Sequence, residues 1–265
     1  MTTLGVIFSP DHPPERLHDV ALAADDAGLE QLWVWEDCFR ESGVAAAAAV
    51  LGWTQRLAVG IGLMPVPLRN VAVTAMEIAT VERLFPGRFV PGIGHGVLDW
   101  MGQVGSRAES PMTLLREYTD ALHRLLGGET VTTSGRYVHL DAVALDWPPS
   151  APPPLLVGAV KPRTLELATT YGDGVILTGD TTVEALRAAQ EPLAAGRAAS
   201  GRDAAEVVVF VTVQGRQPVA DIVAKVDEYV AAGATTVALH AVGDDQYPHE
   251  DFVRLVAGDV RGAVD

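Results

Sequence analysis

Short apolar runs alternate with longer segments of helical periodicity along the whole chain. The short runs are rich in β-branched residues and apolar on both faces, which is typical of strands buried in a parallel sheet. We expect eight strands, over Leu4–Phe8, Gln31–Trp35, Leu57–Ile61, Arg88–Val90, Leu155–Val157, Gly174–Leu177, Val207–Val211 and Thr235–Leu239. Helices are expected over Pro14–Gly28, an alanine-rich segment after the second strand, Val71–Phe85, Met112–Leu126, Pro162–Tyr171, Thr182–Ser200, Val219–Ala232 and Glu250–Val260.

This alternation predicts the α/β class and, within it, a (β/α)8 TIM barrel rather than an open doubly wound sheet. The rhythm breaks only between the fourth and fifth strands, where the helix over Met112–Leu126 is followed by a polar, proline-rich stretch over Gly127–Pro154. Tyr137–Leu140 within that stretch indicates a strand. We therefore expect a single barrel domain over residues 1–265, with a short insertion between strands 4 and 5.

The composition narrows the classes of partner. The formal net charge of −15 would repel nucleic-acid backbones and anionic membranes, so we expect neither as a partner. The one cysteine, Cys38, excludes a disulfide within the chain and suits a reducing compartment. No signal-peptide pattern is visible, and the longest apolar run, Val44–Trp53, is too short to span a bilayer. We expect a cytoplasmic protein that acts on a small molecule.

Two glycine-bearing segments follow predicted strands, where TIM barrels carry their reactive groups. In Gly92–Gly96, three glycines at alternate positions would let the backbone approach a flat ring or a phosphate, or would simply form a tight turn. The run Gly158, Ala159, Val160, Lys161 leads into the helix that begins at Pro162. Free N–H groups, the helix dipole and Lys161 could bind an anion there; a solvated Lys161 and Arg163 pair is the alternative.

A third segment, Gly62–Leu68, is unusually apolar for the loop after a strand and includes Leu63 and Met64. Such a segment would be buried, either under a planar ring system or against the insertion. Glu36 and Asp37 end the second strand, where a carboxylate is either functional or caps a helix.

His95 lies between two glycines and could serve as an acid or base, although a lone histidine is often structural. Asp11, His12 and His240 also follow strands and are weaker candidates. The histidines lie on separate loops without metal-ligand spacing, so we expect no metal site.

Four blocks of the sequence resemble the luciferase-like monooxygenase superfamily, and its coenzyme F420-dependent oxidoreductase branch in particular. They fall in the same order as in that family: Gly28–Asp37, Arg56–Asn70, Glu77–Gly96, and Pro162–Ala168 with Gly172–Val175. The third block is the most specific. The family fold is a (β/α)8 barrel that binds FMN or the deazaflavin coenzyme F420.

The resemblance implies roles for several residues. It implies a cis peptide bond between Gly62 and Leu63, in a bulge that backs the deazaflavin ring, and Glu36 near the polar edge of that ring. It also implies that backbone around Gly94–Gly96 and Gly158–Lys161 holds the cofactor phosphate. Relatives are commonly dimers, so a homodimer is expected.

Two positions depart from the relatives that oxidise sugar phosphates. Val97 stands where those relatives carry a glutamate, and Asp37 where they carry a histidine. These departures put the sugar-phosphate reaction in doubt for this chain.

The sequence thus favours an oxidoreductase that moves a hydride between the deazaflavin C5 and an unidentified organic substrate, with His95 and Asp37 facing that substrate. Three alternatives stay open. They are an FMN-dependent monooxygenase of the same superfamily, a flavin-binding protein without catalysis, and an unrelated barrel lyase or isomerase that works through strand-end carboxylates.

Overall fold

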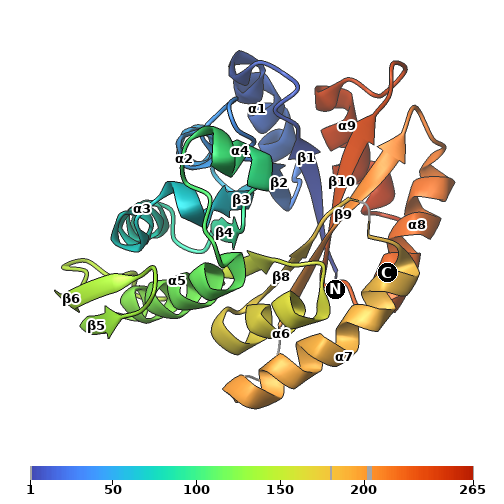
Figure 1. Ribbon diagram of the computed structural model, residues 1–265. Coiled ribbons are helices and arrows are strands. Elements are labelled where there is room, and N and C mark those ends of the chain that lie inside the picture. Colours follow the sequence, from blue (N-terminus) through green and yellow to red (C-terminus); the bar gives the residue numbers. More distant parts are fainter. Residues whose placement is uncertain (1, 180, 202–204, 265) are drawn as a thin grey trace.

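The computed structural model describes residues 2–179, 181–201 and 205–264. Parallel strands close into a barrel in the order β1-β10-β9-β8-β7-β4-β3-β2, which confirms the predicted (β/α)8 fold (Figure 1). The barrel strands are β1 (Thr3–Phe8), β2 (Gln31–Val34), β3 (Ala58–Pro65), β4 (Phe89–Gly94), β7 (Leu156–Gly158), β8 (Gly174–Leu177), β9 (Glu206–Gln214) and β10 (Thr236–Val242).

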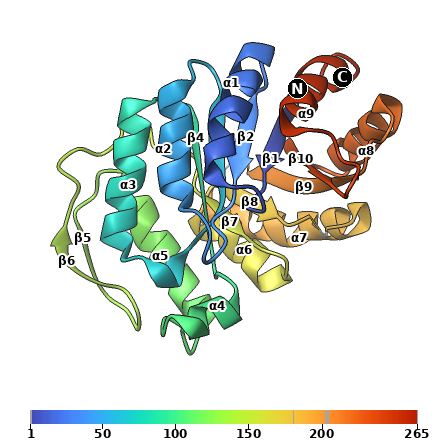
Figure 2. The ribbon, with the colours of Figure 1, turned by 90° about the horizontal axis from the view of Figure 1, so that it is seen from above.

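Helices surround the barrel as an outer ring (Figure 2). They are α1 (Leu17–Ala27), α2 (Gly43–Trp53), α3 (Val71–Leu84), α5 (Pro111–Leu126), α6 (Pro162–Tyr171), α7 (Val183–Ser200), α8 (Val219–Ala231) and α9 (His249–Leu255). Shorter turns are η1 (Pro14–Arg16), η2 (Val66–Leu68), the π-helical η3 (Val256–Val260) and α4 (Leu98–Gln103), which the sequence pattern did not predict. The first helix ends as expected at Gly28, whose φ of 77° is one that glycine adopts without strain.

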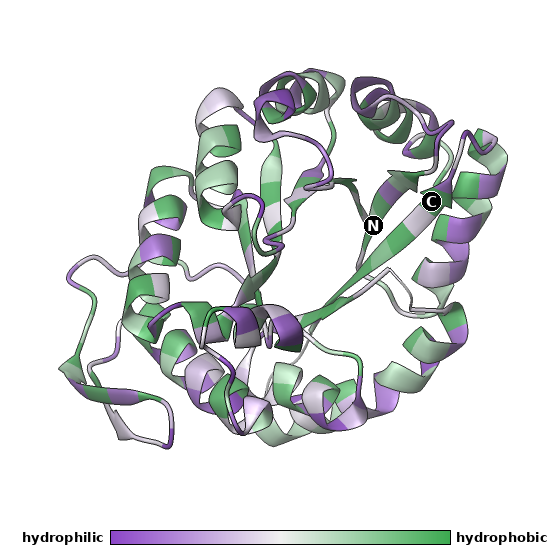
Figure 3. Cartoon of the chain, turned by 45° about the horizontal axis from the view of Figure 1, so that its top comes forward, coloured by the Kyte–Doolittle hydropathy of each residue, from purple (hydrophilic) through white to green (hydrophobic). Residues whose placement is uncertain are grey.

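The core has two layers. The larger one lies between strands and helices, and Figure 3 shows the matching pattern of mostly hydrophobic strands and helices with both kinds of residue. The second fills the barrel interior with Ile7, Trp33, Val90, Leu156, Ile176, Val208, Phe210 and Ala238. Trp33 is fully buried there, and a Cβ at Gly60 would lie 2.4 Å from its ring. Glycine in β3 therefore makes room for the indole that plugs the barrel.

The insertion forms a two-stranded antiparallel hairpin of β5 (Val131–Ser134) and β6 (His139–Val143), beside α5 and outside the barrel (Figure 1). The predicted strand over Tyr137–Leu140 overlaps β6. Glu117 of α5 accepts hydrogen bonds from the backbone N–H groups of Arg136 and Tyr137, at 3.0 and 2.9 Å. These bonds fix the turn of the hairpin to the helix.

Two predicted strand ends were wrong. The third strand continues beyond Ile61 to Pro65, and the fourth continues beyond Val90 to Gly94. Pairing between β3 and β4 shifts register between Ile61 and Met64 and then resumes, so the glycines lie within paired strands. The bulge contains the expected cis peptide bond between Gly62 and Leu63, and a second one joins Cys38 to Phe39.

Candidate active site

The loops after the strands enclose a cavity of about 880 Å³ at the C-terminal mouth of the barrel. Its lining brings together the loop after β2, the β3 bulge, the segment after β4, the loop before α5, the end of β7 and start of α6, the loop after β8, and β9. These residues are Trp35, Glu36, Asp37, Gly62, Leu63, Pro65, His95, Gly96, Val97, Trp100, Glu109, Ser110, Pro111, Met112, Gly158, Ala159, Val160, Lys161, Thr164, Thr178, Gly179 and Phe210.

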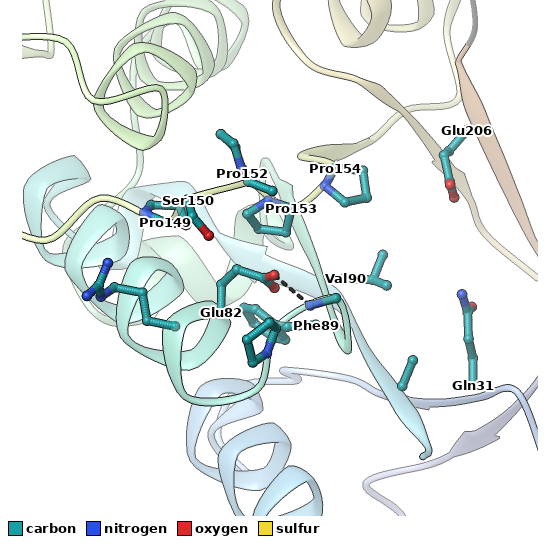
Figure 4. Close-up of a pocket in the computed structure, with 15 residues that line it drawn as sticks. Gln31, Glu82, Phe89, Val90, Pro149, Ser150, Pro152, Pro153, Pro154 and Glu206 are labelled. Carbon is teal, nitrogen blue, oxygen red and sulfur yellow. Dashed lines mark hydrogen bonds between the residues drawn. The ribbon is translucent and has the colours of Figure 1, made fainter. Parts of the chain in front are cut away.

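A second cavity, of about 540 Å³, lies at the opposite mouth, where the strands begin (Figure 4). Gln31 and Glu206 stand at the starts of β2 and β9, and the proline-rich segment 149–154 forms another wall. In TIM barrels the chemistry is found at the C-terminal mouth, whereas the N-terminal mouth serves stability. The larger cavity is therefore the candidate active site.

The two glycine-bearing crossovers lie side by side at one rim. Strand β4 pairs in parallel with β7, with Gly92 opposite Leu156 and Ile93 opposite Val157. The segments that follow, at His95 and before Pro162, therefore open into the same cavity, as a shared cofactor site requires.

The glycines at the ends of β4 and β7 make room for Leu63. A Cβ at Gly158 would lie 2.2 Å from Leu63 Cδ1, and one at Gly94 would lie 2.8 Å from the same atom. From sequence, Gly94 is expected to let a ring or phosphate approach the backbone or to form a tight turn, and Gly158 to belong to an anion site at the helix start. In the structure the Leu63 side chain occupies that space, projecting from the bulge onto the glycines and forming part of the cavity wall.

Gly96 has a different reason to be glycine. Its φ is 69°, and a Cβ there would lie 3.0 Å from both Met101 Sδ and Pro65 Cβ. A side chain would be strained in this conformation as well as crowded. The turn after β4 therefore depends on glycine at this position.

Helix α6 opens toward the cavity at its N-terminus. Lys161 precedes the helix with extended backbone, its side chain does not cap the helix, and Pro162 occupies the first turn. Uncapped N–H groups and the positive end of the helix dipole favour an anion at such a position. Lys161 is exposed and lines the cavity, so its ammonium can add to this field.

Glu36 is held by partners within the chain. Its carboxylate accepts hydrogen bonds from both terminal nitrogens of Arg69, one of them at 2.9 Å, and from the Gly43 N–H at 2.8 Å. Arg69 also pairs with Glu77 at 3.2 Å. Glu36 lines the cavity, as predicted, but it is 8% exposed and its oxygens are already engaged, so its first role in the geometry is to anchor the end of β2.

Asp37 and His95 are the half-buried titratable groups of the lining. Burial raises the pKa of Asp37; nearby Arg40 lowers it and Asp11 raises it further. Burial lowers the pKa of His95, and the nearby Pro111 backbone partly opposes that change. Burial therefore makes each of these two groups harder to charge than it is in water.

Other candidates are not part of this lining. Met64 and Gly94 are buried and do not contribute to it; Met64 packs between strands and helices. Among the strand-end histidines, the ring of His12 lies 4.4 Å from that of His249, and the ring of His240 lies 4.9 Å from that of Trp35.

The aromatic part of the cavity was missed from sequence. Trp35 stacks on Phe210 with ring centroids 6.0 Å apart, and Trp100 of α4 adds a further ring to the lining. The strand pattern held a usable signal, because side chains alternate along a strand. Trp35 is two residues from the buried Trp33, so it points to the same side.

The described residues hold neither a metal-binding cluster nor a membrane-spanning helix. Among residues 2–179, 181–201 and 205–264, no three or more His, Cys, Asp or Glu side chains are grouped so that they could hold a metal ion. Over the same residues, no helix combines the length and the apolar character needed to cross a membrane.

Comparison with known proteins gives the family. The model of the luciferase-like monooxygenase family matches residues 2–264. The chain belongs to this family. It is 29% identical over 208 residues to the 5,10-methylenetetrahydromethanopterin reductase of Methanolobus tindarius, covering 78% of this chain and 63% of that protein. It is 32% identical over 209 residues to the F420-dependent glucose-6-phosphate dehydrogenase of Kineococcus radiotolerans, covering 73% of this chain and 61% of that protein.

This luciferase-like chain thus spans less than two thirds of the length of both relatives. Solved structures share its fold at low identity. An F420-dependent secondary alcohol dehydrogenase with an F420-acetone adduct superimposes with a TM-score of 0.88 at 17% identity, covering 100% of this chain and 99% of the other. The oxygenating constituent of 3,6-diketocamphane monooxygenase from Pseudomonas putida, in complex with FMN, gives 0.81 at 14% identity, with the same coverage.

Proposed function

We propose that this chain is a coenzyme F420-dependent oxidoreductase that transfers a hydride between the deazaflavin C5 and an organic substrate. The observation that carries the proposal is the shared cavity. Leu63, projecting from the β3 bulge, and the uncapped start of α6 bound one space of about 880 Å³. A flat ring needs the first feature and a phosphate needs the second. F420-dependent relatives support the choice of cofactor.

The residues present fit such a cofactor. Trp35 Nε1 and His95 Nδ1 belong to cavity-lining residues, are buried, and have no hydrogen-bond partner among the described residues. Buried polar atoms are almost always paired, so unpaired ones at a cavity favour a bound polar molecule. We propose that Gly62, Leu63 and Gly96 support the ring and that Gly158–Lys161 holds the phosphate.

Coenzyme F420, when bound, supplies the hydride chemistry. The chain would bind and orient it: Leu63 would support the ring, and the α6 start with Lys161 would hold the phosphate. We propose that His95 moves a proton at its imidazole. Because burial lowers the pKa of this ring, it stays neutral near pH 7 and can accept a hydroxyl proton. Asp37 would hold the substrate by a hydrogen bond.

A titration tests the proposal. Purified protein is titrated with F420 and separately with FMN, each followed by its own absorbance. We expect saturable binding of F420 with a Kd of about 1–100 μM, weaker binding of FMN, and turnover of bound F420 with an organic substrate. If neither compound binds in this range, the proposal is wrong.

An FMN-dependent monooxygenase is the second candidate, because the FMN-bound structure described above shares the fold. Preference for FMN in the same titration, with consumption of oxygen, would support it. Binding without turnover by any acceptor would instead indicate a carrier.

We also propose that the chain works as a cytoplasmic homodimer that contacts itself through α2 and α3. Helix α2 has no charged residue, and α3 exposes Val73 and Met76, which are 47% and 59% accessible. In a chain of net charge −15, this face exposes apolar side chains and no exposed carboxylate, its exposed charge being that of Arg83, so a second copy can approach it with little repulsion between carboxylates. The single cysteine suits a reducing compartment.

A further inference from the structure

The two ends of the candidate cavity differ in chemistry. Toward α6 the lining consists of small residues and backbone, with Lys161 beside them. The rest of the wall is aromatic and apolar, with Trp35 stacked on Phe210, and Val97 and Trp100 contributed by the segment after β4. Large flat side chains of this kind bind apolar or planar molecules.

The charges of the lining point the same way. Among its described residues, Lys161 is the one lysine or arginine, and the proposed cofactor phosphate uses it. The carboxylates are Glu36, Asp37 and Glu109. Glu36 is neutralised by Arg69 and Glu109 is paired with Arg136.

Asp37 is the remaining carboxylate. Arg40 is the basic residue whose charge acts on Asp37. Its guanidinium, however, donates hydrogen bonds to the Pro10 carbonyl at 2.7 Å and to the Asp11 carboxylate. An anionic substrate at this end would therefore meet a carboxylate without a cation of its own. Like charges in a partly dehydrated pocket repel strongly, whereas a hydroxyl or carbonyl can hydrogen-bond with Asp37 and His95.

We propose that the substrate is an uncharged, largely apolar alcohol or carbonyl compound, bound against Trp35 and Trp100, and not a phosphate ester. This inference rests on the proposed F420 function, and it names the substrate class of the same cavity. It agrees with Val97, which places an apolar side chain where the sugar-phosphate-oxidising relatives are expected to carry a carboxylate.

The test compares two probes that share one ring system. Protein saturated with F420 is titrated calorimetrically with 2-naphthol and with 2-naphthyl phosphate. We expect 2-naphthol to bind at least about tenfold more tightly, because the phosphate brings negative charge to a site without a free cation. Equal or tighter binding of the phosphate overturns the inference, and so does failure of both probes to bind.

Two tryptophan variants test where 2-naphthol binds. Trp100→Ala should weaken 2-naphthol binding about tenfold, through loss of ring stacking, and leave the Kd for F420 unchanged. Trp147→Ala is the matched control, because this exposed tryptophan stacks near Arg83, outside the cavity. An unaltered 2-naphthol Kd in Trp100→Ala overturns the assigned place. Failure of the wild-type protein to bind F420 would refute the proposed function instead, and is read in a separate titration.

Discussion

At the scale of single residues, Glu36 and Asp37 are neighbours on one loop but differ in their contacts. The Glu36 carboxylate accepts hydrogen bonds from Arg69 and from the Gly43 N–H. Asp37 lines the same cavity, and no guanidinium among the described residues forms a hydrogen bond with it. Breaking a buried ion pair from one side costs about 3–5 kcal/mol, so Glu36 is constrained by stability. Asp37 is free to serve a ligand. Sequence position alone could not separate them.

His95 gives a prediction at this scale. His95→Ala should lower kcat roughly 10²- to 10⁴-fold, the usual contribution of a positioned acid or base, and change the Kd for F420 much less. Steady-state kinetics and an F420 titration of the same preparation measure both. Loss of cofactor affinity with unchanged kcat would show that His95 supports binding rather than proton transfer.

At the scale of elements, the β3 bulge and the glycines beside it form one unit. Gly158→Ala places a Cβ 2.2 Å from Leu63 Cδ1 and should destabilise the protein by about 1–3 kcal/mol, as overpacking does, and weaken F420 binding. Urea unfolding and cofactor titration provide the measurements.

The same unit supplies its own controls. In the Leu63→Ala, Gly158→Ala double variant, the added methyl should cost less than in the wild-type background, because its obstacle has been removed. Gly102→Ala adds a Cβ with no atom within 4 Å and should not reduce stability. Additive effects of the two substitutions would contradict the contact.

The start of α9 makes stability depend on pH. His249 is 8% exposed, and burial, followed by nearby His12, lowers its pKa from 6.5 to about 4. The unfolded chain therefore binds this proton more readily than the folded one. The stabilisation is complete above pH 6.5 and is lost as the pH falls toward 4, an effect of about 3.5 kcal/mol at most, since one pKa unit corresponds to about 1.4 kcal/mol.

Replacing the His249 ring tests whether this residue causes the loss of stability at low pH. His249→Phe should unfold at more nearly equal urea concentrations at pH 7 and pH 4.5 than the wild type does. His139→Phe, which changes an exposed histidine, should keep the wild-type dependence. A His249→Phe protein with the full wild-type decline would place the titrating group elsewhere.

The sequence predicts which strands and helices form more reliably than it predicts where β3 and β4 end. Apolar periodicity was enough to predict the barrel strands and most outer helices, because burial on one or two faces controls both. The ends of β3 and β4 were misplaced because glycine and proline there resemble turn residues, while in the structure they belong to paired strands around a bulge. Trp35 and Phe210 were missed as cavity residues because alternation groups Trp35 with Trp33, but strands apolar on both faces do not show which of the two sides points inward.

At the scale of the whole molecule, the acidic surface leaves an apolar face without exposed carboxylates over α2 and α3. Met76→Glu, which puts charge on a 59% exposed side chain of that face, should shift the proposed dimer toward monomer. Sedimentation velocity at several concentrations measures the shift. Val104→Glu, a substitution of another exposed apolar residue, is the control. If the wild-type protein is monomeric at every concentration tested, the proposed dimer is wrong.

Trp33, which fills the barrel interior, limits the direction from which ligands can reach the candidate active site. Because Trp33 and its neighbours fill the interior, the cavity at one mouth has no passage to the other. A molecule that reaches the candidate site therefore enters from the C-terminal side of the barrel, where the loops that line the cavity lie. A cofactor bound deeper than the substrate would have to bind before it and leave after it.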